Sequence, residues 1–427
     1  MKKKFLYTLL ILSLSFSTVT FAEESKTAKL LNEGQNLLFQ GKYDAALKVL
    51  KAAAKESPDS SSVLLYLARA YSFNNELDKA EAPLKKILKK QVDHIEAGQL
   101  LAQIYNRQKK YKELVEVLEP LLEYRHDYPN YQLLAQATYK LDKLKDSQKY
   151  YEEAIKLNNQ NPEDHYNLGN IHLLNLEYAK AANSYNQAMN LKMNTPELHF
   201  KLATVYFNLR NYFGQLQQIQ VKSGQENSIH GNWYLVEKKS EDFFLAAPAK
   251  SAIYHIAKAI DSELGKNFSV KLLKANIFLS GRRYQQAKKL FGELKDNVPN
   301  DEKALYFFYF SQACLGEYDF VGYLGHLKKA IELNPKNYKK SLVDAYLLVA
   351  SHHRQNGEMA KTVDFMKKAL QESPKNAGLH LRLATDYEEI EEFKDASRHW
   401  NMVLALESDH PKRVEIINLL EKYRKKL

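Results

Sequence analysis

Polar side chains recur along the chain at steps of 33 or 34 residues. The row contains amide, guanidinium and hydroxyl groups: Gln35, Arg69, Gln103, Gln136, Asn170 and Thr204, followed after a gap by Asn276. Amides and guanidinium groups offer several hydrogen-bond donors or acceptors each, so such a row can bind an extended peptide backbone or a sugar. The chemistry that this spacing favours is recognition by hydrogen bonds.

Motifs for catalysis, metal ligation and phosphate binding are absent from the sequence. It holds no His-Glu-x-x-His, Cys-x-x-Cys, glycine-rich phosphate loop or Gly-x-Ser-x-Gly. The adjacent His352 and His353 lie on different faces of a predicted helix, so they are not expected to share a metal. The acidic cluster at 388–392 is either a solvated face or a docking site for a basic partner. We therefore predict no enzyme, no cofactor and no metal site.

The elements that must position the polar row are predicted to be helix pairs. In the segment 34–58, apolar residues recur every three or four positions on both sides of a turn at Gly41, and Pro58 ends the second helix. Small residues allow the paired helices to approach closely. The small residue of the first helix recurs in successive repeats as Gly34, Ala68, Ala102, Ala135, Gly169 and Ala203. Internal repeats of this period predict a solenoid of helix pairs.

The repeat resembles the tetratricopeptide repeat (TPR). The positions that carry the resemblance in the first repeat are Gly34, Tyr43, Ala46, Leu50, Ala53 and Pro58. The resemblance implies an all-α fold, a right-handed superhelix (α-solenoid) of about ten helix-turn-helix repeats with a C-terminal capping helix. For function it implies a general interaction scaffold.

In this family the first helices of successive repeats line a concave groove, and the resemblance places the polar row there. The predicted partner-binding residues are Arg69, Gln103, Arg107, Gln136, Tyr139, Lys140, Tyr166, Asn167, Asn170, Lys201, Thr204 and Phe207. Aromatic and adaptable polar side chains together are typical of interaction surfaces. The alternative is an ordinary exposed helix face of a polar array.

Repeat spacing divides the chain into five segments. They are a signal peptide (1–22), an N-terminal array (23–212), an irregular segment (213–266), a C-terminal array (267–410) and a capping helix (411–427). The irregular segment is interpreted as a degenerate repeat whose second helix covers about 249–264. Residues 213–248 are then a hinge or a binding element. In the capping helix, Val414, Ile417 and Leu420 form the predicted apolar face.

The N-terminus has the pattern of an export signal. Three lysines precede a short apolar run, and Thr20 to Ala22 supply a small-residue cleavage site. We therefore expect export to the periplasm of a Gram-negative bacterium and no stable membrane insertion after cleavage; an uncleaved anchor is the alternative. The single cysteine, Cys314, excludes an intramolecular disulfide and is expected to be buried.

The net charge of +11 raises nucleic acid as a partner. Lysines mix evenly with acidic residues along the predicted second helices, however, and no basic block alternates with aromatics, so no nucleic-acid binding is expected. We predict a non-catalytic, exported protein–protein interaction scaffold that binds a peptide or partner protein in cell-envelope assembly or secretion. Two alternatives are a carbohydrate-associated role in exopolysaccharide export, with polysaccharide as partner, and a non-catalytic subunit of an envelope enzyme complex.

Overall fold

The computed structural model describes residues 25–214, 216–220, 234–239, 242–246 and 251–425. The predicted signal peptide, residues 1–22, lies outside the described residues. The chain divides into two compact units, Met1–Met193 and Asn194–Leu427, which we call the first and the second unit. This boundary lies one helix before residue 212, where the sequence pattern placed the end of the N-terminal array.

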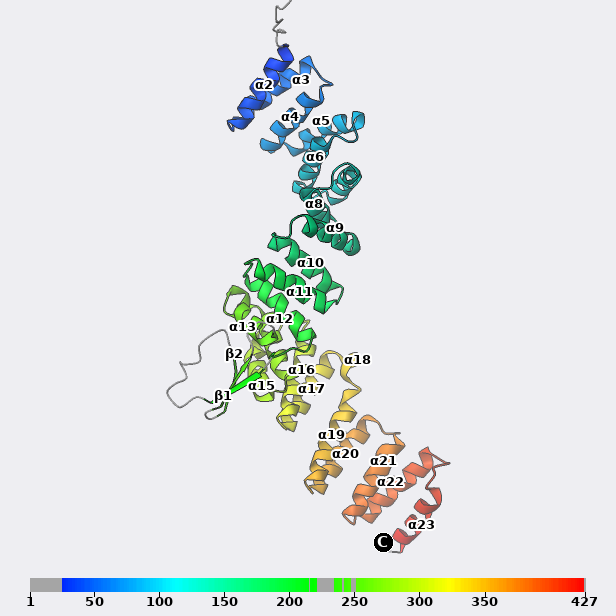
Figure 1. The fold of residues 1–427 in the computed structure, drawn as a ribbon. Coiled ribbons are helices and arrows are strands. Elements are labelled where there is room, and N and C mark those ends of the chain that lie inside the picture. Colours follow the sequence, from blue (N-terminus) through cyan, green and yellow to red (C-terminus); the bar gives the residue numbers. More distant parts are fainter. Residues whose placement is uncertain (1–24, 215, 221–233, 240–241, 247–250, 426–427) are drawn as a thin grey trace, which may run out of the picture. The chain divides into compact units, whose positions relative to one another are not determined.

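The first unit consists of five helix hairpins in its described part (Figure 1). Their helices pair in chain order: α2 (Lys26–Phe39) with α3 (Tyr43–Glu56), α4 (Ser61–Phe73) with α5 (Leu77–Lys90), α6 (Ile95–Arg107) with α7 (Tyr111–Leu118), α8 (Tyr128–Lys140) with α9 (Leu144–Leu157), and α10 (Pro162–Leu174) with α11 (Tyr178–Asn190). A short 3-10 helix, η1 (Pro120–Glu123), extends α7. The first helices α2, α4, α6 and α8 also contact one another in order, so they form one continuous face.

Local sequence sets where these helices begin and turn. The first helices follow residues whose side chains accept a hydrogen bond from the opening turn: Ser25, Ser60, His94, Asp127 and Asn161. A left-handed residue follows two positions after the last residue of each first helix: Gly41, Asn75, Lys109, Asp142 and Leu176. Glycine adopts this conformation without a steric penalty, whereas Leu176 does so at a cost of roughly 1 kcal/mol.

The predicted small residues lie where paired helices meet. Gly34 and Gly169 are buried against Leu50 and Tyr185, and a Cβ atom at either glycine would lie 2.5 or 2.6 Å from those side chains. Real side chains do not approach so closely, so these positions require glycine as the helices are packed. Ala181 is fully buried in the same way. The fold predicted from the spacing of small residues is confirmed.

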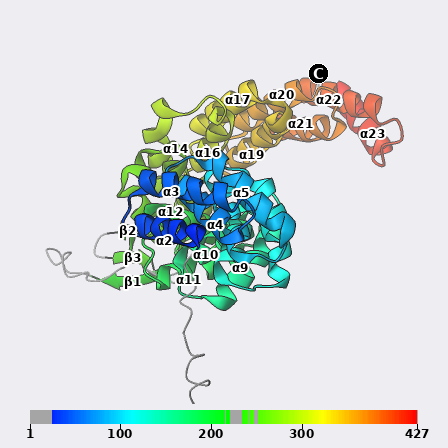
Figure 2. The same cartoon turned by 90° about the horizontal axis from the view of Figure 1, so that it is seen from above.

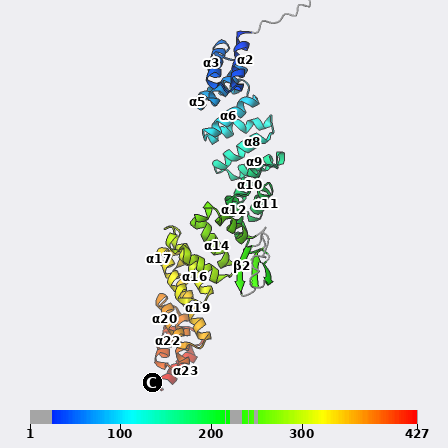
Figure 3. The same cartoon turned by 90° about the vertical axis from the view of Figure 1, so that its left-hand side faces the viewer.

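The second unit also contains five hairpins in its described part (Figure 3). They are α12 (Pro196–Asn208) with α13 (Ala252–Ile260), α14 (Phe268–Ser280) with α15 (Tyr284–Leu294), α16 (Lys303–Gly316) with α17 (Phe320–Leu333), α19 (Ser341–Gln355) with α20 (Met359–Glu372), and α21 (Ala377–Glu389) with α22 (Phe393–Leu406). The remaining helices are short or terminal: η3 (Glu263–Lys266), η4 (Lys295–Asn297), α18 (Pro335–Tyr338) and α23 (Arg413–Arg424). Ten hairpins in the two units agree with the predicted number.

A three-stranded antiparallel sheet is inserted in the chain between α12 and α13. Its three strands are labelled in Figure 2. Its strands are β1 (Leu216–Gln220), β2 (Tyr234–Lys239) and β3 (Asp242–Ala246), in the order β1-β3-β2. In the registers, β3 Ala246 is opposite β1 Leu216 on one side and β2 Tyr234 on the other, and β2 has an irregularity between Leu235 and Glu237. No strand was predicted from the sequence.

The helix predicted at about 249–264 is present as α13 (Ala252–Ile260), but the sheet corrects the interpretation of residues 213–266 as a separate degenerate repeat. Backbone N–H groups of Ala252 and Ile253 donate to the carbonyls of Asn211 and Tyr212, each at 3.0 Å. The residues that precede and follow the insertion are therefore hydrogen-bonded to each other, and α13 packs on α12 as the second helix of the same hairpin. The segment holds one repeat interrupted by an insertion, because an insertion between two helices leaves their contact intact.

Two smaller predictions concern the second unit. Cys314 is buried, as expected, and burial raises the pKa of its thiol to about 11. The C-terminal helix α23 packs through Ile416 and Tyr423 instead of the predicted face, since Val414 is 71% exposed and Ile417 is exposed as well. Within the described part of the chain, no helix combines the length and the apolar character that crossing a membrane requires.

Candidate functional site

The two arginines predicted for the groove connect neighbouring repeats in the first unit. Arg69 donates to Glu96 at 3.1 Å, and its guanidinium lies 4.8 Å from the centre of the Tyr66 ring. Arg107 reaches back to α4, where it donates to the carbonyl and hydroxyl oxygens of Ser72 at 3.1 Å each. Both guanidinium groups therefore have partners within the protein.

Three further predicted residues support the α10–α11 hairpin. The Tyr185 hydroxyl donates to Asn170 Oδ1 at 2.8 Å, and the Tyr166 ring packs on the Tyr185 ring with centroids 5.7 Å apart. Asn167 hydrogen-bonds Tyr151 on the preceding repeat. These side chains hold the repeats together, so their first role is structural.

A smaller part of the predicted set faces outward without such partners. Gln103 and Lys140 are exposed, whereas Gln136 and Tyr139 are half-buried. The side chains of Gln103, Gln136 and Lys140 form no hydrogen bond with another described side chain. The structure places them on α6 and α8, which are neighbouring first helices. We call Gln103, Gln136 and Lys140 the polar patch of the first unit.

The last three predicted residues lie on α12 and belong to the second unit. Thr204 donates back to the carbonyl of Phe200 at 2.9 Å, and the Phe207 ring lies 5.7 Å from the Tyr212 ring. Lys201 is half-buried. The predicted set is thus divided between the two compact units.

Two adjoining cavities in the second unit were not predicted. The cationic cavity has a volume of about 260 Å³ and is lined by Leu347, Ala350, Ser351, Arg354, Thr362, Met366, Leu381, Arg382, Thr385 and Asp386. The aromatic cavity has a volume of about 320 Å³ and is lined by Leu315, Tyr318, Phe320, Leu348, Ser351, His352 and Gln355. Ser351 on α19 belongs to both linings.

The register of the polar row would have located these cavities. Ser351 and Thr385 directly follow the small residues Ala350 and Ala384, just as Gln136 follows Ala135. All three therefore occupy the same position of a first helix. The predicted row ended at Asn276 and therefore did not include Ser351 or Thr385.

The cationic cavity is built around an ion pair. Arg354 on α19 pairs with Asp386 on α21, whose side chain is almost fully buried, and with the exposed Glu389 at 3.3 Å. A buried carboxylate needs such a partner, because an unpaired charge is costly away from water. Arg382 is exposed and has no ion-pair partner among the described residues. The cavity thus offers guanidinium and hydroxyl donors along one wall.

The aromatic cavity lies on the other side of α19. Phe320 and Tyr318 lie 4.7 and 5.5 Å from the His352 ring, measured between centroids. Tyr318 is 69% exposed and adopts a left-handed conformation with φ of 57°, and Leu348 is 43% exposed. Large apolar side chains exposed around a cavity are typical of binding sites.

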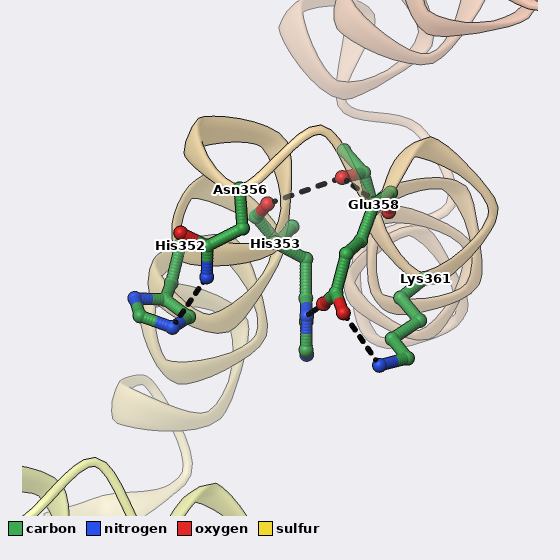
Figure 4. A network of polar contacts seen from close by, with 7 residues as sticks. His352, His353, Asn356, Glu358 and Lys361 are labelled. Carbon is green, nitrogen blue, oxygen red and sulfur yellow. Dashed lines mark hydrogen bonds and ion pairs between the residues drawn. The ribbon is translucent and has the colours of Figure 1, made fainter.

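The adjacent histidines separate, as predicted. His352 faces Asn356, whereas His353 pairs through Nδ1 with Glu358 at the start of α20 (Figure 4). Lys361 donates to Glu358 at 2.9 Å, and together with His353 it holds the pKa of this carboxyl below its usual value. Among the residues that the structure describes, no three His, Cys, Asp or Glu side chains are grouped to hold a metal ion.

The acidic cluster of α21 has internal partners. Glu388 accepts a hydrogen bond from Trp400 Nε1 at 2.5 Å and another from the Tyr423 hydroxyl, which joins α21 to α22 and α23. Glu389 pairs with Arg354. Both glutamates therefore connect α21 to other helices of the second unit. Because they have these partners, they support neither a purely solvated face nor a free docking site.

Comparisons with known proteins agree with this architecture. Two family models described as tetratricopeptide repeat match residues 37–104 and 133–190. A DnaJ homolog subfamily C member 3 homolog from Dictyostelium discoideum is 26% identical over 43% of this chain. A tetratricopeptide repeat protein 21 homolog from Caenorhabditis briggsae is 27% identical over 36%. The chain covers only 33% and 12% of the lengths of these two relatives.

Solved structures show local similarity. The MamA 41-end structure from Desulfovibrio magneticus RS-1 is 24% identical with a TM-score of 0.37, covering 40% of this chain and 97% of that one. The Pseudomonas aeruginosa pilF structure is 16% identical with a TM-score of 0.37, covering 43% and 84%. Scores below 0.5 establish no closer relationship. From the repeat geometry and the two family matches, the chain contains tetratricopeptide repeats.

Proposed function

We propose that the protein is a scaffold that binds an extended segment of a partner protein across the first helices of its second unit. The observation that carries this proposal is the pair of cavities that meet at Ser351. Tetratricopeptide arrays use extended surfaces of this kind for binding. The lining supplies hydrogen bonds and apolar contact, which suit recognition.

The two cavities suit different parts of such a segment. The aromatic cavity, with Tyr318, Phe320 and His352, suits a large apolar side chain, since burying one contributes about 1.5–3 kcal/mol. The hydroxyl of Thr385 and the guanidinium of Arg382 can donate to the carbonyl groups of the neighbouring backbone. Apolar anchoring with adjacent polar contacts is typical of interaction hot spots.

The first unit supplies a second, polar contribution. Gln103, Gln136 and Lys140 lie on neighbouring first helices and have no described side-chain partners, so they can hydrogen-bond a peptide without breaking contacts between repeats. Arg69, Arg107 and Asn170 are already hydrogen-bonded inside the protein. We therefore assign the partner contacts of this unit to the polar patch.

We propose a periplasmic setting and a role in cell-envelope assembly or secretion. This part of the proposal is supported by the three N-terminal lysines followed by an apolar run and a small-residue cleavage site. Fractionation of the source cells, followed by N-terminal sequencing of the mature chain, would test it. A mature chain that begins near Glu23 in the periplasmic fraction is the expected result, and an intact N-terminus in the cytoplasm would contradict it.

Partner capture from an extract of the source cells tests the binding proposal. Ser351→Gln places a longer side chain where the two cavities meet and should weaken capture at least tenfold, which corresponds to about 1.4 kcal/mol. The matched control is Glu372→Gln at the exposed end of α20, away from both linings. Unchanged capture by Ser351→Gln, with an unchanged helical circular dichroism signal, would refute the assignment.

A further inference from the structure

Two hairpins of the second unit each contain a buried pair of histidines. His199 on α12 faces His255 on α13, and His380 on α21 faces His399 on α22, with an Nδ1–Nδ1 distance of 2.8 Å in both pairs. The second ring of each pair stacks on a tyrosine of the first helix, with centroids 5.6 or 5.7 Å apart. Three of the four rings are buried, and that of His399 is half-buried.

The hydrogen bonds around each pair determine its tautomers. His380 Nε2 lies 3.0 Å from the carbonyl oxygen of Pro374, which can only accept, so His380 carries its proton on Nε2. Its Nδ1 is therefore an acceptor, and His399 Nδ1–H is the donor between the rings. The same reasoning applies to His199, whose Nε2 lies 2.7 Å from Asn194 Oδ1. With neutral rings, each contact thus contains one proton, which His255 donates in the first pair and His399 in the second.

An added proton has no favourable place in the first pair. His255 Nε2 is buried, and the structure shows no hydrogen-bond partner for it among the described residues. A proton on His199 Nδ1 would instead place two donors against each other. In either case a charge appears inside the hairpin, which is costly because it is removed from water.

Equivalent positions in other hairpins hold tyrosine and phenylalanine rings. His199 and His380 lie four residues before the small residues Ala203 and Ala384, and Tyr131 and Tyr346 lie four residues before Ala135 and Ala350. Tyr131 packs on Tyr150 in α8–α9, and Tyr346 packs on Phe365 in α19–α20. The repeat thus accepts an aromatic pair at this site, and histidine is not needed for packing.

We propose that the two histidine pairs act as proton-operated latches, which hold α12 to α13 and α21 to α22 at neutral pH and release them in acid. The latch in α12–α13 also closes the hairpin that contains the inserted sheet. The latch in α21–α22 holds the helix that supplies Arg382 and Thr385 to the cationic cavity. The release itself does not depend on what the cavity binds.

The direction of the pH dependence follows from the charges around each pair. Burial, and then His199, lowers the pKa of His255 to about 3; burial, and then Lys258, lowers the pKa of His199. Burial, and then His380, lowers the pKa of His399 to about 4. Around this second pair, Arg398 of α22 and Lys367 of α20 act in the same direction, whereas Asp395 of α22 acts in the opposite one.

In the unfolded chain a histidine binds its proton near pH 6.5, well above these folded values. The stabilising contribution is therefore complete above about pH 6.5 and is lost as the pH falls towards about 4. Each proton that only the open hairpin binds shifts the opening equilibrium tenfold per pH unit. The latches should therefore open progressively in mild acid.

Hydrogen exchange of the full-length protein at about pH 7 and about pH 5, corrected for the chemical exchange rate, tests the proposal. Protection in α12–α13 and α21–α22 should fall at least tenfold, and protection in α8–α9, which has the Tyr131–Tyr150 pair, should change much less. The α19–α20 hairpin is a poorer control because a further histidine, His353, pairs with Glu358 within it. Equal loss in all hairpins would overturn the proposal without any variant being needed.

A double substitution sharpens the test. H380Y with H399F gives α21–α22 the pair found in α19–α20 and should remove the acid response of that hairpin only, while α12–α13 retains its own response. If α21–α22 of the folded double variant still loses protection in acid to the same extent, the second latch is refuted. If the variant does not fold, the comparison of hairpins in the unaltered protein still decides the question.

Discussion

One helix position carries hydrogen-bonded long side chains in two repeats of the first unit and short side chains beside cavities in two repeats of the second. In the first unit it carries long side chains such as Arg69 and Asn170, which hydrogen-bond neighbouring residues. In the second unit it carries Ser351 and Thr385, whose short side chains leave cavities between first helices. The comparison shows that side-chain length decides the role of this position. A long side chain there can join neighbouring repeats, whereas a short one can leave space for a binding site.

The largest effect on stability is expected when a buried aromatic ring is removed from the first unit. Tyr185→Ala should reduce the free energy of unfolding by about 3–5 kcal/mol, because it creates a cavity and leaves Asn170 without its partner. Chemical denaturation with hydrogen exchange would show the loss concentrated in α10–α11. If α10–α11 kept its stability, Asn170 would have no structural role and the contrast between the units would disappear.

A smaller effect is expected from overpacking. Ala181→Leu inserts a side chain into a fully buried helix contact and should cost about 1–3 kcal/mol, read from the shift of the thermal melting curve. Ala287→Leu is the matched substitution in the second unit, where the residue occupies the same position of α15 and is equally buried. An unshifted melting temperature in both variants would contradict the register on which the comparison rests.

Stability measured at increasing alkaline pH distinguishes a tyrosine of the first unit from one of the second unit. Burial, and then Asp164, raises the pKa of Tyr128 to about 12, against about 10 in an unfolded chain. Its contribution to stability is therefore complete below about pH 10 and is lost as the pH rises towards 12. Tyr128→Phe should lower stability at neutral pH by about 1–3 kcal/mol, since buried Asp164 loses a donor at 2.6 Å, and should flatten this alkaline loss.

Tyr306 provides the comparison within the second unit. Burial raises its pKa to about 12 as well, and its hydroxyl donates to the carbonyl of Phe291 at 2.7 Å. Tyr306→Phe should flatten the alkaline loss of hydrogen-exchange protection in α15–α16 without changing that of α8–α10. If Tyr128→Phe left the alkaline response of the first unit as steep as before, Tyr128 would not be the titrating group.

The smallest expected effect concerns turn residues with positive φ. Leu176→Gly and Tyr318→Gly each relieve a left-handed backbone conformation and should raise stability by roughly 0.5–1 kcal/mol. Only Tyr318 lines a cavity, so Tyr318→Gly should also weaken partner capture while Leu176→Gly should not. Equal capture by both variants would argue against the aromatic cavity.

The sequence predicted the helix pairs well because their packing is local and periodic. Gly34 and Gly169 lie at helix contacts, and the spacing of small residues was sufficient to find them. The sheet between α12 and α13 was missed because an insertion leaves the flanking helices in contact and has no repeat of its own. The helix predicted at about 249–264 exists as α13, but it completes the hairpin of α12 and does not belong to a separate degenerate repeat.

The candidate site was predicted only as a row of positions. Spacing indicates which residues lie on the first helices, but the neighbouring repeat decides whether a side chain is already hydrogen-bonded. Arg107 illustrates this, because its acceptor Ser72 lies 35 residues earlier. The cavities at Ser351 depend on short side chains, which a search for long polar groups does not find.

Site-specific photo-crosslinking in the source cells tests most directly whether the second unit binds a partner at these cavities. A photoreactive side chain at Thr385, inside the cationic cavity, should give a discrete crosslinked product that Ser351→Gln abolishes. The same group at Glu372, outside both linings, should give none. Crosslinking from Glu372 but not from Thr385 would contradict the account.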